Sequence, residues 1–256
     1  MGLLKIFVGF LLIGSSILSS AALTIKDGVL TVGVAPESPP LLFLENGIYS
    51  GLEADYARLI ANQLKLKLEF VTIADNKLVN ALESNQVDLI MNGLKVSSEL
   101  SQKVHILPSY LESSQMAIIL YDNILKLGGP GQLYRADKII GVIKNSSGET
   151  LVEVEIADGT IKYYSNLEQG VKALRNSEIN YLIHDATTSW HLARDLDYKD
   201  LQSLYKPLNK EELAFAVSKN NPLLIQKIER LFRDWKTQGI IDVMNRRWIK
   251  AKMEVN

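Results

Sequence analysis

The sequence predicts an α/β protein of two lobes, each built on a mostly parallel sheet with covering helices, joined by two hinge strands. Short apolar runs that suit strands alternate with stretches whose apolar residues recur at helical spacing, which is typical of such sheets. The alternation occurs in two separate units. Two apolar runs, 116–121 and 213–217, connect the units, so we expect the second lobe to be inserted into a discontinuous first lobe.

The first unit begins with the β-rich apolar run from Val29 to Val34. Leu52, Leu59 and Leu64 then belong to one apolar face at helical spacing. In full, we expect strands at 29–34, 68–73 and 87–91 and helices at 52–64 and 78–82. Ser97 or Ser98 can cap the next helix by accepting a hydrogen bond from its backbone.

The second unit repeats this order after the apolar strand at 116–121. Gly128 to Gly131 is a loop by composition, and Asn145 to Gly148 separates a strand from a helix. The expected elements are strands at 116–121, 139–143, 179–183 and 213–217, a short strand ending at 163–164, and helices at 149–156, 167–174 and 187–195.

Two amphipathic helices follow the second unit. Asn221 caps the first helix, and Pro222 stands in its first turn, where no backbone donor is lost. Gly239 ends that helix, and the second runs to about Ile249. We therefore assign residues 23–116 and 218–256 to the first lobe, and 117–217 with the hinge strands to the second. Hinge strands let two lobes close on a ligand; two rigid domains are the alternative.

The N-terminus is expected to be a signal peptide, residues 1–22. Lys5 precedes an apolar stretch from Ile6 to Leu18, and small residues follow. This stretch is short for a membrane-spanning helix, which needs roughly 20 residues; a permanent anchor is the alternative. Because the chain has no cysteine, a thioether-linked lipid and disulfides are excluded. We expect a soluble monomer in a periplasm.

Charge and motifs argue against several classes of function. Lys and Arg total 28 against 29 for Asp and Glu, so neither nucleic acid nor an anionic membrane is the expected partner. The three histidines have no metal-binding spacing, and the sequence contains no nucleophile elbow and no phosphate-binding loop. We therefore expect no metal, no cofactor and no catalytic residues.

Several segments occur in an order that resembles one family. They are Pro39 to Phe43, Gly51 to Ala57, Ala81 to Ile90, Ile183 to Asp185 and Gly239 to Trp248. Together they resemble the bacterial periplasmic solute-binding proteins of family 3, the polar-amino-acid receptors of ABC importers. The resemblance covers nearly the whole chain after the leader. It implies the type II periplasmic-binding-protein fold and an ABC permease as partner.

The resemblance also implies where a ligand would bind. Asp185 corresponds to the carboxylate that pairs with a ligand's α-ammonium, and Ser97 to a threonine that meets the α-carboxylate. Ser146 and Ser147 would supply donors from the opposing lobe, and His184 would contact the ligand's side chain.

The segment from Gly93 to Tyr110 departs from the family's pattern Gly-x-Thr-x-Thr-x-Glu-Arg. Leu100 stands where the arginine is expected, and Lys95 where the first threonine is. A leucine cannot replace a guanidinium, which holds a carboxylate through two parallel hydrogen bonds. The positions where aromatic rings would be expected are occupied by Leu41, Ser38 and Asp75. A ligand without an α-carboxylate, or no ligand at all, is therefore compatible with the sequence.

Each of these residues also has a simpler interpretation. Asp185 can cap the helix that follows it, and Ser97 the helix of its own segment. Lys95 and Lys144 could contact an anion from facing lobes or could equally be surface lysines, and His184 could be a surface residue.

We expect a periplasmic substrate-binding protein of an amino-acid-type ABC importer, which captures a small polar solute between its lobes. One alternative is a receptor-like sensor or interaction protein that has lost amino-acid binding. An enzyme on the same scaffold is the least favoured alternative.

Overall fold

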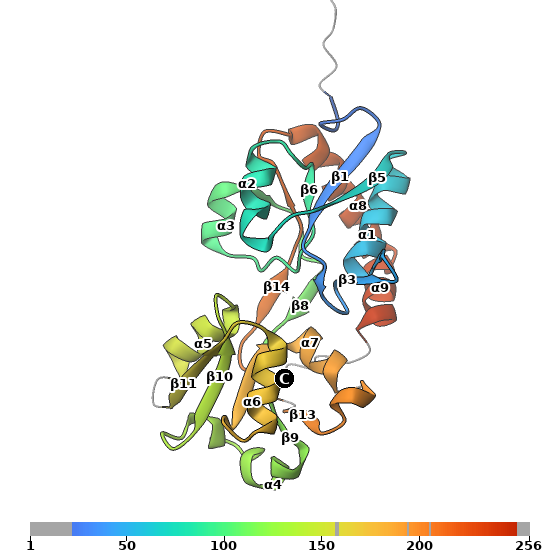
Figure 1. Cartoon of the computed structure of the whole chain (residues 1–256). Helices are drawn as coiled ribbons and strands as arrows, with labels where there is room; N and C mark the ends of the chain where they lie inside the picture. Colours follow the sequence, from blue (N-terminus) through green and yellow to red (C-terminus); the bar gives the residue numbers. More distant parts are fainter. Residues whose placement is uncertain (1–21, 157–158, 194, 205, 250–256) are drawn as a thin grey trace, which may run out of the picture.

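The computed structural model describes residues 22–156, 159–193, 195–204 and 206–249. The predicted signal peptide lies outside the described residues apart from Ala22, as do residues 250–256 of the predicted first lobe. The described chain forms two lobes, one above the other in Figure 1, and strands β8 (Leu111–Ser113) and β14 (Glu211–Leu213) run between them. The predicted two-lobed α/β architecture is confirmed.

Lobe 1 is built on a sheet of order β5-β1-β6-β15-β7. These strands are β1 (Val29–Val34), β5 (Lys67–Thr72), β6 (Leu89–Ile90), β7 (His105–Ile106) and β15 (Ala216–Val217). Strand β1 runs parallel to β5 and β6, whereas β15 runs antiparallel to β6 and β7. Because β15 comes from a distant part of the chain, lobe 1 is discontinuous.

Helices cover both faces of the lobe 1 sheet. They are α1 (Leu52–Gln63), α2 (Leu78–Glu83), α3 (Ser98–Lys103), α8 (Pro222–Thr237) and α9 (Ile240–Trp248). Successive strand residues point to opposite faces: Leu89 joins the core beneath α1 and α8, whereas Ile90 joins the core beneath α2. Helix α8 turns the apolar stripe of Leu224, Ile228, Phe232 and Trp235 inward, as its helical spacing predicts.

A small sheet of β2 (Glu37–Ser38), β3 (Leu42–Glu45) and β4 (Ile48–Ser50) packs beside α1. Both lobes also contain short 3-10 helices. They are η1 (Asp75–Lys77) in lobe 1, and η2 (Tyr121–Asn123), η3 (Gln132–Tyr134) and η4 (Leu196–Tyr198) in lobe 2.

Lobe 2 repeats the plan with a sheet of order β11-β10-β12-β9-β13. Its strands are β9 (Gln115–Leu120), β10 (Ile139–Ile143), β11 (Thr160–Tyr164), β12 (Tyr181–Asp185) and β13 (Leu201–Ser203). Its helices are α4 (Ile124–Leu127), α5 (Ser147–Glu155), α6 (Leu167–Arg175) and α7 (Ala186–Leu192). Ile183 packs with α5, whereas the adjacent Leu182 packs with α6, so this sheet is also covered on both faces.

The link between the lobes differs from the sequence prediction. The runs at 116–121 and 213–217 were expected as hinge strands, but β9 and β15 belong to the sheets of lobes 2 and 1. The antiparallel pair β8 and β14 links the two lobes instead. Each strand begins a few residues earlier in the sequence than the run that was predicted as a hinge strand. The physical reason is that apolar runs mark core strands, whereas this pair carries polar residues such as Glu112 and Glu211.

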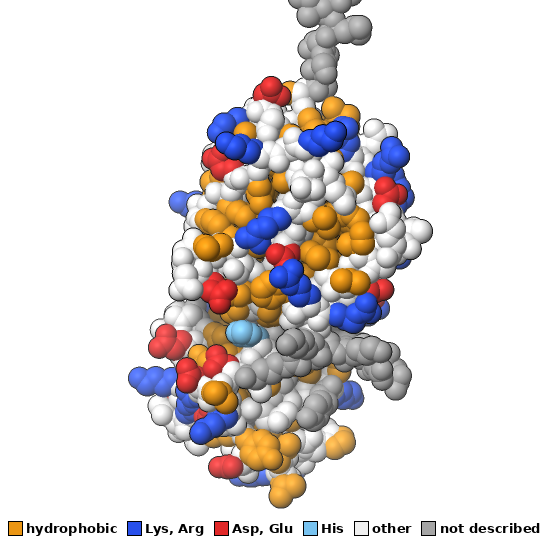
Figure 2. Space-filling view, turned by 90° about the vertical axis from the view of Figure 1, so that its right-hand side faces the viewer, with side chains coloured by type: hydrophobic (Ala, Val, Ile, Leu, Met, Phe, Trp, Pro, Cys, Tyr) orange, Lys and Arg blue, Asp and Glu red, His pale blue; other side chains and the backbone are white. Residues whose placement is uncertain are grey.

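Some apolar side chains remain on the surface. Ile48 in β4 is 63% exposed and Val243 in α9 is 59% exposed. Figure 2 shows hydrophobic side chains on the upper lobe interspersed with Lys and Arg. Within the described residues, none of the helices combines the length and apolar character needed to cross a membrane.

Candidate functional site

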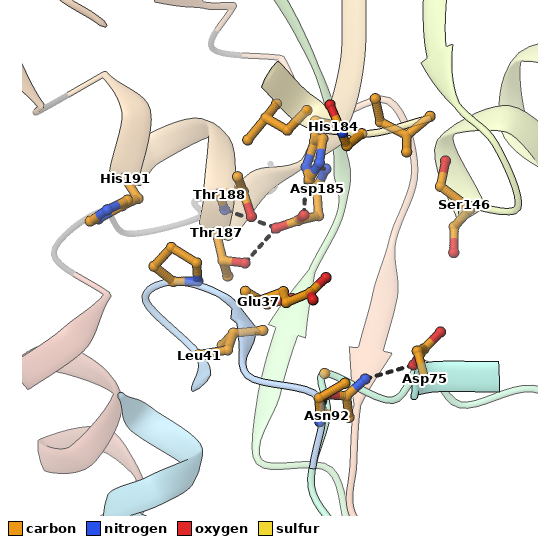
Figure 3. Close-up of a pocket in the computed structure, with 18 of the residues that line it drawn as sticks. Glu37, Leu41, Asp75, Asn92, Ser146, His184, Asp185, Thr187, Thr188 and His191 are labelled. Carbon is orange, nitrogen blue, oxygen red and sulfur yellow. Dashed lines mark hydrogen bonds and ion pairs between the residues drawn. The ribbon is translucent and has the colours of Figure 1, made fainter. Parts of the chain in front are cut away.

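A cleft of about 970 Å³ is lined by both lobes and by the hinge. Part of its lining comes from segments that directly follow parallel strands in the sequence. Asn92 to Lys95 come after β6, and Asn145 to Ser147 come after β10. Open α/β sheets bind ligands at this edge, and small-molecule sites occupy roughly 300–1,000 Å³. The lining includes Ser38, Lys95 and Ser147. It also includes residues that Figure 3 labels: Glu37, Leu41, Asp75, Ser146, His184, Asp185, Thr187, Thr188 and His191.

Asp185 ends β12 and caps α7 at the wall of this cleft. Its Oδ1 accepts hydrogen bonds from the Thr187 hydroxyl at 2.5 Å and from the Thr188 N–H at 2.8 Å. Burial would raise the pKa of this carboxyl, but the charge and hydrogen bond of His184, together with both threonine bonds, hold the pKa well below its usual range. The side chain stays 24% exposed, so Asp185 presents a negative charge to the cleft.

The contact between His184 and Asp185 indicates where the imidazole carries a proton. Its Nδ1 lies 2.6 Å from Oδ2 of Asp185 and 3.0 Å from the Asp185 backbone nitrogen. One ring nitrogen cannot donate to the carboxylate and accept from that N–H at the same time. The shorter contact joins the nitrogen to an ionised oxygen, so we assign the proton to Nδ1.

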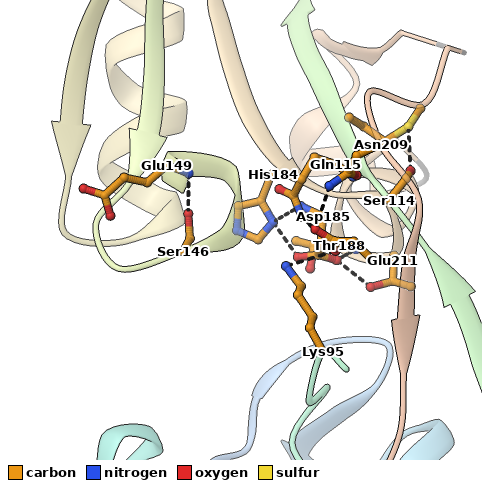
Figure 4. Close-up of polar contacts among 12 residues, drawn as sticks. Lys95, Ser114, Gln115, Ser146, Glu149, His184, Asp185, Thr188, Asn209 and Glu211 are labelled. Carbon is orange, nitrogen blue, oxygen red and sulfur yellow. Dashed lines mark hydrogen bonds and ion pairs between the residues drawn. The ribbon is translucent and has the colours of Figure 1, made fainter. Parts of the chain in front are cut away.

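Lys95 lies at the hinge end of the cleft, where its backbone bridges to Leu213. Its Nζ lies 3.1 Å from Oε2 of Glu211, whose side chain is only 9% exposed. Gln115 and Asn209 also donate hydrogen bonds to the Glu211 carboxylate, as Figure 4 shows. The lysine predicted as an anion contact therefore lines the cleft but is already paired with a carboxylate.

Ser146, Ser147 and Leu41 also line the cleft. The Oγ of Ser146 caps α5 by accepting the Glu149 N–H at 3.2 Å, and Ser147 begins that helix. Leu41 is buried and forms an apolar wall beside Gly93. Among the described lining residues, Tyr198 is the only aromatic ring apart from the histidines, in keeping with Ser38, Leu41 and Asp75 at the positions where rings were expected.

Ser97 and Lys144, both predicted as ligand contacts, are not among the described residues that line the cleft. Ser97 is exposed and caps α3, where its Oγ accepts the Leu100 N–H at 3.1 Å. Lys144 is exposed between two lining residues, Ile143 and Asn145, in the turn that follows β10, where Asn145 has φ 60°. Leu100 packs against the apolar cluster of α2 and β6.

Several lining residues were missed by reasoning from the sequence. Thr187 and Thr188 are buried and orient Asp185; hydroxyl residues in the first turn after an aspartate were the available signal. Asn92 donates a hydrogen bond to Asp75 at 2.6 Å within lobe 1. Ser113 of the hinge is 2% exposed and lines the cleft. The surrounding sequence, Glu112-Ser113-Ser114, gives no signal for this position.

Glu53 lies buried beneath the cleft at the start of α1. Its Oε1 accepts hydrogen bonds from the Tyr110 hydroxyl at 2.6 Å and from the N–H of the lining residue Gly93 at 2.8 Å. Burial raises the pKa of Glu53 to about 7, although both hydrogen bonds lower it. Glu53 is therefore an enclosed carboxyl group below the cleft lining.

The donor set favours binding of a polar organic molecule. Within the described ranges, no group of three or more His, Cys, Asp or Glu side chains is placed to hold a metal ion. The polar groups that converge on the cleft are an oriented carboxylate, hydroxyls and amides. Such groups fix the orientation of a small polar ligand through hydrogen bonds.

Comparison with known proteins matches this chain to a protein family. The model of bacterial extracellular solute-binding proteins, family 3, matches residues 30–251. L-cystine-binding protein TcyJ of Escherichia coli (strain K12) is 20% identical over 231 residues, which cover 88% of this chain and 84% of TcyJ. Amino-acid-binding protein AabA of Dichelobacter nodosus is 26% identical over 219 residues, covering 83% of this chain and 85% of AabA.

A solved structure shows the same fold. It is the amino acid ABC transporter substrate-binding protein AbpA from Streptococcus pneumoniae, bound to L-arginine. The TM-score is 0.74 at 18% identity, over 87% of this chain and 95% of AbpA.

Proposed function

The chain belongs to the bacterial extracellular solute-binding proteins of family 3, and we propose that it captures an amino acid or a related small polar solute in its cleft. Its partner would be the permease of an ABC importer, to which it presents the loaded form. The chain would act in the periplasm after removal of the predicted leader at residues 1–22. We propose no catalytic role for it.

The observation that carries this proposal is the ionised, oriented carboxylate of Asp185 in a cleft between two lobes. A carboxylate held by two hydrogen bonds needs no reorganisation to receive an ammonium group, and charge-assisted hydrogen bonds are strong. Capping α7 and binding a ligand are compatible roles, because an ionised carboxylate can accept about four hydrogen bonds. Thr187 and Thr188 use Oδ1 and His184 contacts Oδ2, and the side chain remains 24% exposed.

The relatives support a solute with an amino group. TcyJ is named for L-cystine, AabA for amino acids, and AbpA is bound to L-arginine. The β8 and β14 pair supports closure, because a narrow two-stranded link can absorb the rotation of one lobe against the other.

A ligand screen tests the proposal. The purified protein is heated with each of the common amino acids, cystine, aliphatic amines, organic acids and short peptides, and hits are titrated by calorimetry. A ligand at about 100 times its dissociation constant adds roughly 2.7 kcal/mol to the stability of the folded state.

Asp185→Asn sharpens the test, because asparagine caps a helix as well as aspartate does but carries no charge. We expect this variant to bind the hit at least about tenfold more weakly. Asp122→Asn, at an exposed acid in η2 outside the described cleft lining, is the matched control and should bind normally. If no compound in the panel binds, the result would favour the alternative, a sensor or interaction protein that has lost its ligand. The supporting observation for that alternative is Leu100, which is partly buried and packs against the cluster of α2 and β6.

A further inference from the structure

The cleft carries an excess of negative charge. Of the described residues that line it, five bear carboxylates, and they come from both lobes: Glu37, Asp75, Glu168, Asp185 and Asp195. Lys95 is the one lysine or arginine in that described lining. Like charges on facing lobes repel, so a cation bound between them relieves the repulsion, whereas an anion adds to it.

Lys95 does not offset this excess. Its ammonium is paired with Glu211 at 3.1 Å, and Glu211 is nearly buried. The ammonium has further N–H donors, but a ligand carboxylate that reached them would lie beside the Glu211 carboxylate, whose like charge repels it. Displacing Glu211 instead would leave a nearly buried charge unpaired, and Glu211 also accepts hydrogen bonds from Gln115 and Asn209.

The other positively charged group of the described lining, His184, lies 2.6 Å from Oδ2 of Asp185 and is paired with that carboxylate. Position 100 is a leucine packed against the cluster of α2 and β6, and Ser97 is occupied in capping α3. The arrangement therefore supplies negative charge for an amine and no free positive charge for a carboxylate.

Ser113 provides an independent indication of a ligand. Its side chain is 2% exposed, and it lines the cleft from strand β8, opposite Glu211 in the strand register. Its Oγ has no hydrogen-bond partner among the described residues. Buried hydroxyls are nearly always hydrogen-bonded, so an unpaired one at the floor of a cleft points to a partner supplied by the solute.

We propose that the solute is a linear aliphatic amine that carries no carboxylate group, and that Asp185 and Ser113 hold it. The inference rests on the proposed function and narrows the solute to one chemical class. The Asp185 carboxylate binds an ammonium group, and the Ser113 hydroxyl accepts a hydrogen bond from the ligand. The remaining carboxylates offset a second positive charge at the other end of the molecule.

Two matched pairs of compounds test the missing carboxylate. Lysine is compared with cadaverine, and arginine with agmatine, because the members of each pair differ only in the α-carboxylate. Dissociation constants are measured by calorimetry on the purified protein at pH 7. We expect at least one amine to bind at least tenfold more tightly than its amino acid, and its affinity to fall as salt is added.

Two serine variants test the role of Ser113. Ser113→Ala removes the cleft hydroxyl, and Ser203→Ala removes another buried hydroxyl without a described partner that lies outside the described cleft lining. We expect Ser113→Ala to weaken amine binding about tenfold at an unchanged melting temperature, because the hydroxyl contacts a charged group. Ser203→Ala should leave the affinity unchanged.

The outcomes separate this inference from the proposed function. If an amino acid binds as tightly as its amine, or an amino acid outside the pairs is the tightest ligand, the function stands and the inference is overturned. If Ser113→Ala changes the melting temperature but not the affinity, the assignment of Ser113 is wrong. If nothing in the wider panel binds, both proposals are rejected.

Discussion

Replacing Glu53 by glutamine should stabilise the protein in a pH-dependent way. Glu53 is fully buried, and both of its described hydrogen bonds go to Oε1, from Tyr110 and from Gly93. Its Oε2 has no partner among the described residues. Glutamine can keep both bonds through its carbonyl oxygen, and it cannot ionise. The substitution therefore removes the cost of a buried charge without removing the contacts.

The magnitude follows from the pKa of Glu53, which burial raises from 4.5 to about 7. Between these two values the folded state binds more protons than the unfolded state, so the stability of the wild type falls as the pH rises. The contribution of the protonated carboxyl is complete below about pH 4.5 and is lost as the pH passes through about 7. A shift of this size corresponds to about 3 kcal/mol.

Urea unfolding at half-unit steps from pH 4.5 to 8 measures this difference. Glu53→Gln should match the wild type near pH 4.5 and exceed it by about 3 kcal/mol at pH 8. Glu45→Gln, at an exposed residue of β3, is the control and should show no such trend. A difference that is constant across the range, or a wild type that is the more stable at pH 8, would refute the reasoning.

Three further substitutions have expected outcomes. Asp185→Ala should lower the free energy of unfolding by about 1 kcal/mol through loss of the α7 cap, whereas Asp185→Asn should lower it by only a few tenths, as measured by thermal denaturation. Trp235→Ala should cost about 3–5 kcal/mol in urea unfolding, because the side chain is 1% exposed in the ring cluster of lobe 1. Gly51→Ala should cost about 2 kcal/mol or more and weaken ligand binding in calorimetry, because Gly51 has φ 117° and a Cβ would overlap the carbonyl oxygen of the cleft residue Leu41.

Each of these outcomes can fail in a recognisable way. Equal losses for the two Asp185 variants would mean that the charge rather than the cap stabilises α7. A loss below 1 kcal/mol for Trp235→Ala would contradict the packing of α8 on α1. If Gly51→Ala binds the ligand normally, Leu41 does not contribute to ligand binding.

Periodicity in the sequence predicted the fold well because core strands and helices bury regular apolar faces. Strand β6 is an example, because Leu89 packs into the core on one face of the sheet and Ile90 into the core on the other. A strand covered on both faces must be apolar at every position, and this pattern is visible in the sequence. The hinge could not be found this way, because β8 and β14 bury little apolar surface and carry acids.

The cleft was only partly predictable for a related reason. The place of Asp185 at the cleft wall was expected from the family resemblance, which aligns it with an aspartate at the end of a strand, and Asp185 does end β12. Lys144 follows β10, but it lies in a turn whose next residue, Asn145, has φ 60°, and strand periodicity does not predict which side chains of such a turn line a cleft. The pairing of Lys95 with Glu211 joins residues more than a hundred positions apart, and no local pattern records it.

The order of the chain through the two lobes has a consequence for how the protein acquires its structure. The sheet of lobe 2 uses residues from 115 to 203 and is complete once that stretch has emerged. Lobe 1 waits for β15, α8 and α9, because Tyr56 packs against Phe232 and Trp235 from the returning segment. When the chain emerges from its N-terminus, lobe 1 therefore starts first and is completed last. Its aromatic core can assemble only after all of lobe 2 has emerged.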